Sequence, residues 1–153
     1  KSSAASDVYK RQLLHSVEKD FSSHPSSGNN QLVLTIQPDL PEISADPERL
    51  IQVVTNLISN AERHTRNGTI TISLTGEPGW QTICVSDTGT GMSEEMQKNA
   101  LKGYVSADKD YWRHGIGLYV CHQIITAHGG KIWLKSKEGE GTQVFFSLPE
   151  EES

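Results

Sequence analysis

Three glycine-bearing turns lie in the second half of the sequence, where each is able to bring a ligand close to the backbone. Glycine tolerates positive φ, and a turn that opens a helix offers unpaired N–H groups to a phosphate. A single Gly-x-Gly is more often a tight turn without function, and the last of the three turns is equally consistent with a hairpin. The turns are Asp87-Thr88-Gly89-Thr90-Gly91, Gly115-Ile116-Gly117 and Gly139-Glu140-Gly141-Thr142.

Two amides and one carboxylate accompany these turns. Asn56 and Asn60 are four residues apart in a segment of helical periodicity, so their side chains share one helical face. Asp87 directly follows an apolar stretch, as a residue at the end of a strand does. A polar helix, an apolar strand and glycine turns in this order favour a ligand site more strongly than any single turn.

This combination resembles the ATP-binding domain of sensor histidine kinases, within the superfamily that includes gyrase, Hsp90 and MutL. The resemblance covers residues 13–149 and depends on four segments, which together are a strong signal. They match the family's N box (Leu50 to Ala61), its G1 box (Asp87 to Met92), its G2 box (Gly115 to Leu118) and its closing segment (His128 to Trp133 with Gly139 to Thr142).

The resemblance implies a role for each polar residue. Asn60 is expected to give a carbonyl oxygen to Mg²⁺, a hard cation that keeps several waters and phosphate oxygens. Asp87 is expected to accept a hydrogen bond from the exocyclic amine of adenine, which selects against guanine. Asn56, expected as a catalytic and nucleotide-binding residue, stands where hydrolytic relatives carry a catalytic Glu, and an amide cannot take a proton from an attacking water. The catalytic site therefore fits a kinase better than a hydrolase.

Other residues complete the implied nucleotide pocket. Gly89 and Gly91 are expected to let the backbone pass close to the base and sugar of ATP. Thr142 is expected to close the adenine pocket from the opposite side, and Met92 to form part of its wall. Arg63, a catalytic candidate, matches the family's basic residue that reaches the phosphates.

The implied lid over the phosphates follows the G1 box. Lys109 and Arg113 lie in it and are expected to steady the γ-phosphate of ATP, Arg113 as a catalytic residue. The helix behind the lid is expected to begin at the G2 box, so that its backbone amides and its dipole hold the phosphates. The residues of that box are Gly115, Ile116, Gly117 and Leu118.

The sequence also departs from the family's pattern. His64, expected to contact a phosphate, stands where many members have Tyr, and Arg113 replaces a further glycine at the start of the G2 box. The phenylalanine-rich F box is represented only by Leu101 and Tyr104, so we expect a short lid. His15 lacks the acidic and basic neighbours of the family's phosphoacceptor histidine, so we expect the acceptor on another domain.

The elements that must position these groups follow from the spacing of apolar residues. Asp46 and Pro47 indicate the start of the longest helix, and Gly129 with Gly130 the end of the last one. The sum is an α+β fold, a two-layer sandwich in which helices cover one face of a mixed, mostly antiparallel sheet. Helices are predicted over 13–21, 46–66, 93–101 and 115–127, strands over 32–36, 69–74, 81–86, 131–136 and 143–148, and a loop over 102–114.

Composition sets the remaining bounds. The 153 residues suit one domain, which we expect over residues 13–149, after a non-native or disordered leader at 1–12 and before a tail at 150–153. The net charge of -5 and the lack of a basic cluster disfavour nucleic acid as a partner. The two cysteines have apolar neighbours and are expected to be reduced core thiols. Without a long apolar run, we expect a cytoplasmic domain that makes no membrane contact itself, whatever anchors its parent protein.

The function that unites these features is transfer of the γ-phosphoryl group of ATP, with Mg²⁺, to a histidine. The expected partners are the dimerisation and phosphoacceptor domain of the same kinase and, downstream, a response regulator. Two alternatives remain open: a catalytically degenerate nucleotide-binding module, and a related ATPase or anti-sigma serine kinase. A dinucleotide-binding fold is disfavoured because the first glycine turn follows an antiparallel strand and does not open a βαβ unit.

Overall fold

The structure, a computed structural model, describes residues 14, 15, 17, 19, 29–41, 43–100 and 109–150, with the backbone alone for Asn99 and residues 109–117. The expected leader at 1–12 lies outside the described residues, as do residues 151–153 of the expected tail. The elements in chain order are β1 (Gln31–Ile36), α2 (Pro47–His64), β2 (Thr69–Glu77), β3 (Trp80–Asp87), α3 (Glu94–Asn99), α4 (Lys109–Ala127), β4 (Lys131–Lys137) and β5 (Gly141–Pro149).

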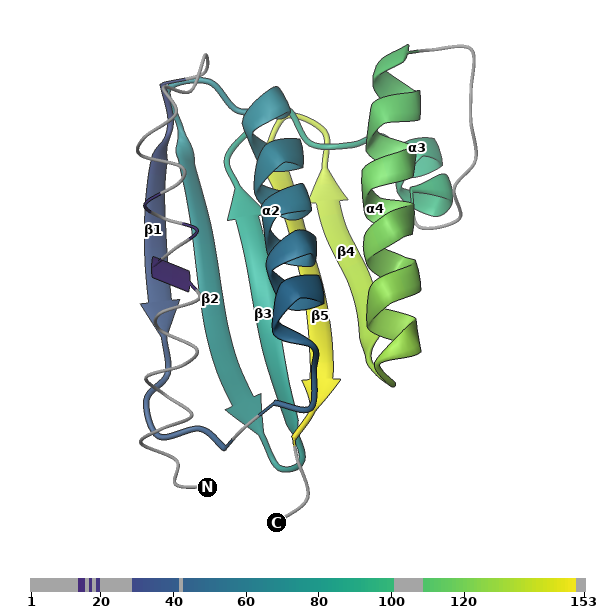
Figure 1. The fold of residues 1–153 in the computed structure, drawn as a ribbon. Helices are drawn as coiled ribbons and strands as arrows, with labels where there is room; N and C mark the ends of the chain where they lie inside the picture. Colours follow the sequence, from purple (N-terminus) through teal and green to yellow (C-terminus); the bar gives the residue numbers. More distant parts are fainter. Residues whose placement is uncertain are drawn as a thin grey trace.

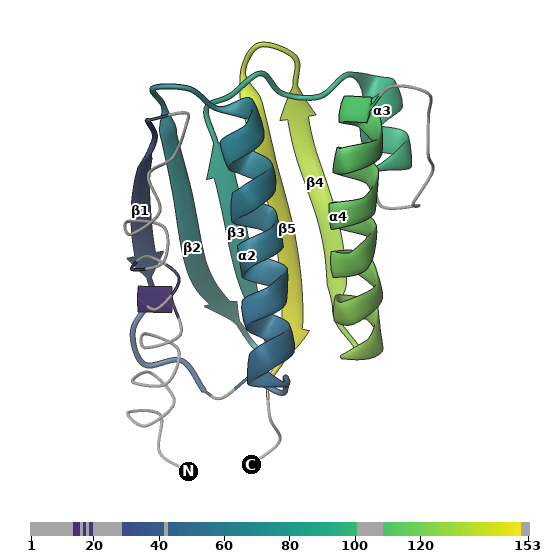
Figure 2. The ribbon, with the colours of Figure 1, turned by 45° about the horizontal axis from the view of Figure 1, so that its top comes forward.

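The strands form one five-stranded sheet in the order β1-β2-β3-β5-β4. β1 and β2 are parallel, since α2 carries the chain back between them, and the other neighbours are antiparallel. Figures 1 and 2 show α2 and α4 side by side on the same face of the sheet, with α3 beside the start of α4. The predicted two-layer α+β sandwich is confirmed, and β3 has the antiparallel neighbours expected before the first glycine turn.

Helix α2 begins and packs as its sequence predicts. The Asp46 carboxylate accepts a hydrogen bond of 3.0 Å from the backbone N–H of Glu48, and Pro47 occupies the first turn. One apolar face of the helix is buried against the sheet and α4, and the polar Asn60 is buried with it. The buried apolar residues are Leu50, Val53, Val54, Leu57, Ile58 and Ala61.

The cap of α2 leads to a first prediction. Replacement of Asp46 by alanine leaves the N–H of Glu48 without its side-chain acceptor, so we expect the free energy of unfolding in urea to fall by about 1 kcal/mol. Asp46→Asn keeps an oxygen at the same place and is expected to retain most of the stability. Equal losses in the two variants would show that the hydrogen bond to the Asp46 oxygen does not account for the loss of stability.

Helix α4 corrects one sequence-based expectation. The helix begins at Lys109, whereas the sequence predicted a loop to residue 114 and a helix from Gly115. Gly115 and Gly117 therefore lie inside α4, where a helical amide donates to the carbonyl four residues earlier and is not open to a phosphate. Residues 109–114 contain neither proline nor glycine, and burial of Leu118 and Cys121 outweighs the cost of about 1 kcal/mol per internal glycine.

The end of α4 is held as the sequence predicts. Gly129 has a φ of 76°, and the N–H of Gly130 donates to the carbonyl of Ile125 at 2.9 Å, a common way to end a helix. His128 joins this end to the start of α2, because its Nε2 accepts the backbone N–H of Asp46 at 3.2 Å. The two helices on the sheet are thus connected at the end of the molecule away from the glycine turns (Figure 1).

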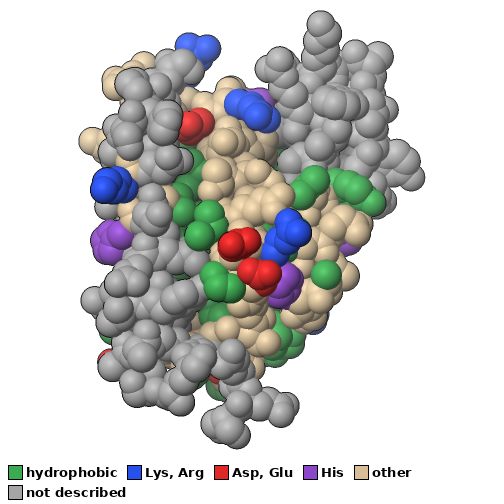
Figure 3. All heavy atoms as spheres, in the orientation of Figure 1, with side chains coloured by type: hydrophobic (Ala, Val, Ile, Leu, Met, Phe, Trp, Pro, Cys, Tyr) green, Lys and Arg blue, Asp and Glu red, His purple; other side chains and the backbone are tan. Residues whose placement is uncertain are grey.

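The two cysteines are buried free thiols, as expected. Burial raises the pKa of Cys84 to about 11 and that of Cys121 to about 12, so both stay protonated and unreactive near neutral pH. On the face that carries α2 and α4, lysine and arginine side chains lie singly among groups of other kinds in the described part (Figure 3). No helix within the described ranges is long and apolar enough to cross a bilayer.

Candidate functional site

A cleft lies where α2 ends beside the last residues of β3 and the first of β5. Its enclosed part is about 10 Å³, the room of a single water, and the cleft opens to solvent beyond it. Polar groups from three distant segments meet here on an apolar floor. The lining residues are Leu57, Asn60, Ala61, His64, Val85, Asp87, Gly91, Met92, Thr142 and Val144.

Asn60 brings a buried acceptor to the cleft from the last turn but one of α2. Only 7% of the residue is exposed, and its Oδ1 makes no hydrogen bond within the part of the chain that the structure describes. A buried acceptor without a partner costs about 1–3 kcal/mol, and a bound cation or donor would remove that cost. A single amide oxygen suits Mg²⁺, which takes its other ligands from water and phosphate, so this residue fits the implied metal.

Asp87 is the acidic group of the cleft. Its Oδ1 accepts the backbone N–H of Gly89 at 2.9 Å and that of Thr142 at 3.3 Å, which fixes the carboxylate in one orientation. Burial raises the pKa of Asp87 above its ordinary value, and the hydrogen bonds from Gly89 and Thr142 oppose that shift. A side-chain hydrogen bond with Thr65 opposes the same shift, so three protein groups contact this carboxylate.

Thr142 and Met92 stand beside this carboxylate. Thr142 is opposite Asp87 in the antiparallel register of β5 and β3, which brings together two residues that are 55 positions apart in the sequence. Met92, 2% exposed, forms part of the cleft wall as predicted. The three residues predicted to contact adenine therefore line one cleft: Asp87 on β3, Met92 in the turn after it and Thr142 on β5.

The glycines of the turns allow backbones to touch one another. A Cβ at Gly89 would collide with the carbonyl oxygen of His64, and one at Gly91 with that of Lys137. The N–H of Thr90 also donates to His64 O at 3.0 Å. Contact with the last residue of α2 and the last residue of β4 thus accounts for the glycines at 89 and 91, while their contact with the base and sugar of ATP stays a prediction. Gly91 also lines the cleft, whereas Gly89 does not.

Two predicted catalytic residues lie outside the cleft lining. Asn56 lies against α4: burial raises the pKa of the Cys121 thiol to about 12, and a hydrogen bond with the Asn56 side chain opposes that shift. Arg63 is exposed on the last turn of α2. His64, the residue after it, does line the cleft. Of the two residues predicted to contact the phosphates, His64 therefore lies at the cleft and Arg63 lies outside its lining.

The lid and G2-box residues are placed only in part. Leu118 is fully buried in the core and does not line the cleft. The backbone of the others forms the first half of α4, and their side chains lie outside the described residues. These residues are Lys109, Arg113, Gly115, Ile116 and Gly117.

The apolar floor of the cleft and a serine behind its wall were not predicted from the sequence. Val85 and Val144 are register partners on β3 and β5, so the alternation of those strands would have found them. Ser136 on β4 contacts both Met92 and Thr142. A strand serine carries no signal of such a contact, because the contact depends on which strands are neighbours.

Comparison with known proteins gives a consistent result. A family model described as "Histidine kinase-, DNA gyrase B-, and HSP90-like ATPase" matches residues 45–152. The adaptive-response sensory kinase SasA of Synechococcus elongatus is 37% identical over 147 residues, which make up 94% of this chain and 38% of SasA. The chain thus spans well under half the length of that relative.

Solved structures agree with the sequence comparison. The nucleotide-free catalytic domain of the histidine kinase ThkA superposes with a TM-score of 0.79 at 27% identity, covering 92% of this chain and 93% of that one. ThkA in complex with the response regulator protein TrrA gives a TM-score of 0.74 at 25% identity, covering 92% of this chain and 40% of that one. The two-layer sandwich is therefore shared with the catalytic domain of a histidine kinase.

Proposed function

Because the chain belongs to the family of histidine kinase-, DNA gyrase B- and HSP90-like ATPases, we propose that it binds ATP in this cleft and donates the γ-phosphoryl group to a histidine. The acceptor histidine is on a separate dimerisation and phosphotransfer domain of the same kinase, and a response regulator is the downstream partner. The similarity to SasA and the structure of ThkA with TrrA support this assignment. We propose the cytoplasm as the location of the domain.

The observation that carries the proposal is the convergence of three polar groups on one cleft. Asn60, Asp87 and Thr142 come from α2, β3 and β5, and all three line the same space. The backbone amides of Gly89 and Thr142 donate to Oδ1 of Asp87, and we assign the other oxygen, Oδ2, to the exocyclic amine of adenine. Asn60 comes to the same cleft from α2, and its amide oxygen suits the metal that accompanies the phosphates of a nucleotide.

The chemistry of the cleft supports transfer to an imidazole over hydrolysis. Among the residues that line the cleft, Asp87 is the only acid. Its carboxylate accepts a backbone amide and is assigned to adenine, so it is not placed to activate a water. Asn56 supplies no general base. Bound Mg²⁺ would neutralise charge on the phosphates, while the chain positions the nucleotide and the acceptor imidazole is the nucleophile.

Two measurements on one sample test the proposal. Isothermal titration with ATP, ADP and GTP, with and without Mg²⁺, is expected to show adenine-specific binding. Incubation with γ-labelled ATP and the kinase's own phosphoacceptor domain is expected to label that domain on histidine. Binding without label would favour the degenerate module, and release of inorganic phosphate or label on serine would favour the ATPase or serine kinase.

Asn60 provides the test of the metal. Since Oδ1 of Asn60 accepts no hydrogen bond among the described residues, Asn60→Ala is not expected to lower the free energy of unfolding appreciably. We expect the variant to lose about tenfold in ATP affinity with Mg²⁺, equivalent to about 1.4 kcal/mol, and little without it. Ser59→Ala, an exposed change on the same helix, is the control. An equal loss with and without Mg²⁺ would assign Asn60 to the shape of the cleft and not to the metal.

A further inference from the structure

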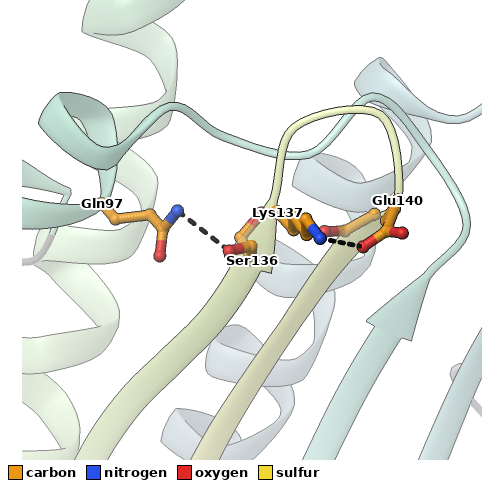
Figure 4. A network of polar contacts seen from close by, with 5 residues as sticks. Gln97, Ser136, Lys137 and Glu140 are labelled. Carbon is orange, nitrogen blue, oxygen red and sulfur yellow. Dashed lines mark hydrogen bonds and ion pairs between the residues drawn. The ribbon is translucent and has the colours of Figure 1, made fainter.

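Ser136 on β4 lies behind the cleft wall and contacts three different segments. Its hydroxyl oxygen is 2.8 Å from the backbone N of Met92, 2.9 Å from the carbonyl oxygen of Gly141 and 2.9 Å from Oγ1 of Thr142. Gln97 of α3 strengthens the same junction, since its Nε2 donates to the carbonyls of Met92 and Ser136 at 2.9 and 3.0 Å. Figure 4 shows Gln97 directed at Ser136, with the exposed Lys137–Glu140 pair outside the junction.

The contacts of Ser136 determine the direction of the Thr142 hydroxyl. A serine hydroxyl donates one hydrogen bond and accepts two. The amide of Met92 can only donate and the carbonyl of Gly141 can only accept, so Ser136 gives its proton to Gly141. Thr142 must then donate its own proton to Ser136, which satisfies all three contacts. The remaining lone pairs of Thr142 Oγ1 act only as acceptors.

We propose that Ser136 is a specificity-determining positioning residue, which holds the Thr142 hydroxyl as an acceptor beside the carboxylate of Asp87. This inference rests on the proposed function, because it concerns how the base of a bound nucleotide is read. With both Asp87 and Thr142 as acceptors, the cleft matches a base edge that carries an amine. An oxo group at the same place meets no donor, and a mismatch of this kind leaves polar groups unpaired.

Removal of the serine hydroxyl tests the assignment. In Ser136→Ala the Thr142 hydroxyl loses its acceptor and turns freely, so it can donate to an oxo group. We expect ATP affinity to fall about fivefold, and ITP affinity to fall less, so that the ATP-to-ITP affinity ratio also drops several-fold. Ser136→Thr keeps the hydroxyl and is expected to restore the ratio. Ser147→Ala, a buried serine on β5 away from the cleft, is the matched control.

The outcomes separate this inference from the proposed function. Titration of wild type, Ser136→Ala and Ser136→Thr with ATP and ITP gives the ratios, and urea unfolding of each confirms that it is folded. Equal losses for ATP and ITP, or no change in either, would overturn the specificity role while leaving the ATP site intact. Failure of Ser136→Thr to restore the ratio would do the same. If the wild type binds neither nucleotide, the proposed function itself fails.

Discussion

Replacement of Asp87 by asparagine is expected to lower ATP affinity about 10- to 100-fold and to abolish the preference for ATP over GTP. The Oδ1 of the asparagine can still accept the backbone N–H groups of Gly89 and Thr142. The group facing the ligand then becomes an NH₂ donor, which opposes the amine of adenine and matches the oxo group of guanine. Loss of a hydrogen bond to a charged group costs about 1.5–3 kcal/mol, which sets the size of the effect.

The same substitution is expected to act on stability in the opposite direction. Burial raises the pKa of Asp87, so the folded state favours the protonated carboxyl more than the unfolded state does. Such a group contributes stability at low pH that is lost as the pH rises through its folded pKa, so ionised Asp87 opposes folding at pH 7. A neutral amide avoids this cost, and Asp87→Asn should be at least as stable as wild type at pH 7 and less dependent on pH above 3.8.

A matched control makes the Asp87 experiment decisive. Asp46→Asn makes the same change from carboxylate to amide at the start of α2, the end of the helix away from the cleft. It keeps the helix cap and should leave nucleotide binding unchanged. Isothermal titration with ATP and GTP, and urea unfolding from pH 4 to 8, give both readouts. If Asp87→Asn binds ATP and GTP in the wild-type ratio, the carboxylate does not read the base.

Replacement of Gly141 by alanine is expected to be the most damaging single change for stability. Gly141 has a φ of 102°, and a Cβ there would collide with the carbonyl oxygen of Asp87. The strands cannot move apart without breaking the hydrogen bonds that join β3 to β5. Strain and displaced backbone together should lower the free energy of unfolding by about 3 kcal/mol, and ATP binding should fall with it.

Gly139 in the same hairpin provides the comparison. It has a φ of 82°, but a Cβ there would meet nothing within 4 Å. Gly139→Ala therefore carries only the cost of the left-handed backbone, about 1 kcal/mol. Urea unfolding of both variants measures the difference. Similar losses at Gly139 and Gly141 would mean that backbone conformation alone, and not contact with Asp87, explains the glycine.

The sequence predicts the elements with strong local signals and misses the weak ones. Helix α2 has a cap, a proline and an unbroken apolar face, and its limits agree within two residues. The start of α4 was wrong because residues 109–114 have no apolar period, and because Gly115 looked like a helix start when packing carries the helix through it. The tertiary contacts that extend α4 to Lys109 cannot be seen in the spacing of neighbouring residues in the sequence.

The sequence identified which residues form the site, but not which groups each of them contacts. The boxes identified Asn60, Asp87 and Thr142, which do meet in one cleft. What a glycine touches depends on segments brought together from far apart, so the contact of Gly89 with the carbonyl of His64 could not be predicted. Ser136 lies outside the residues assigned to the site, and only the strand order shows its place behind Thr142.

The pairing of Asp87 with Thr142 has a consequence for how this domain tolerates change. The two residues are spaced by the hydrogen-bonded ladder of adjacent antiparallel strands, and not by flexible loops. Insertion of one residue within either strand would shift the pairing and turn every later side chain to the opposite face of the sheet. Base recognition is therefore expected to be lost on addition of a single residue within β3 or β5.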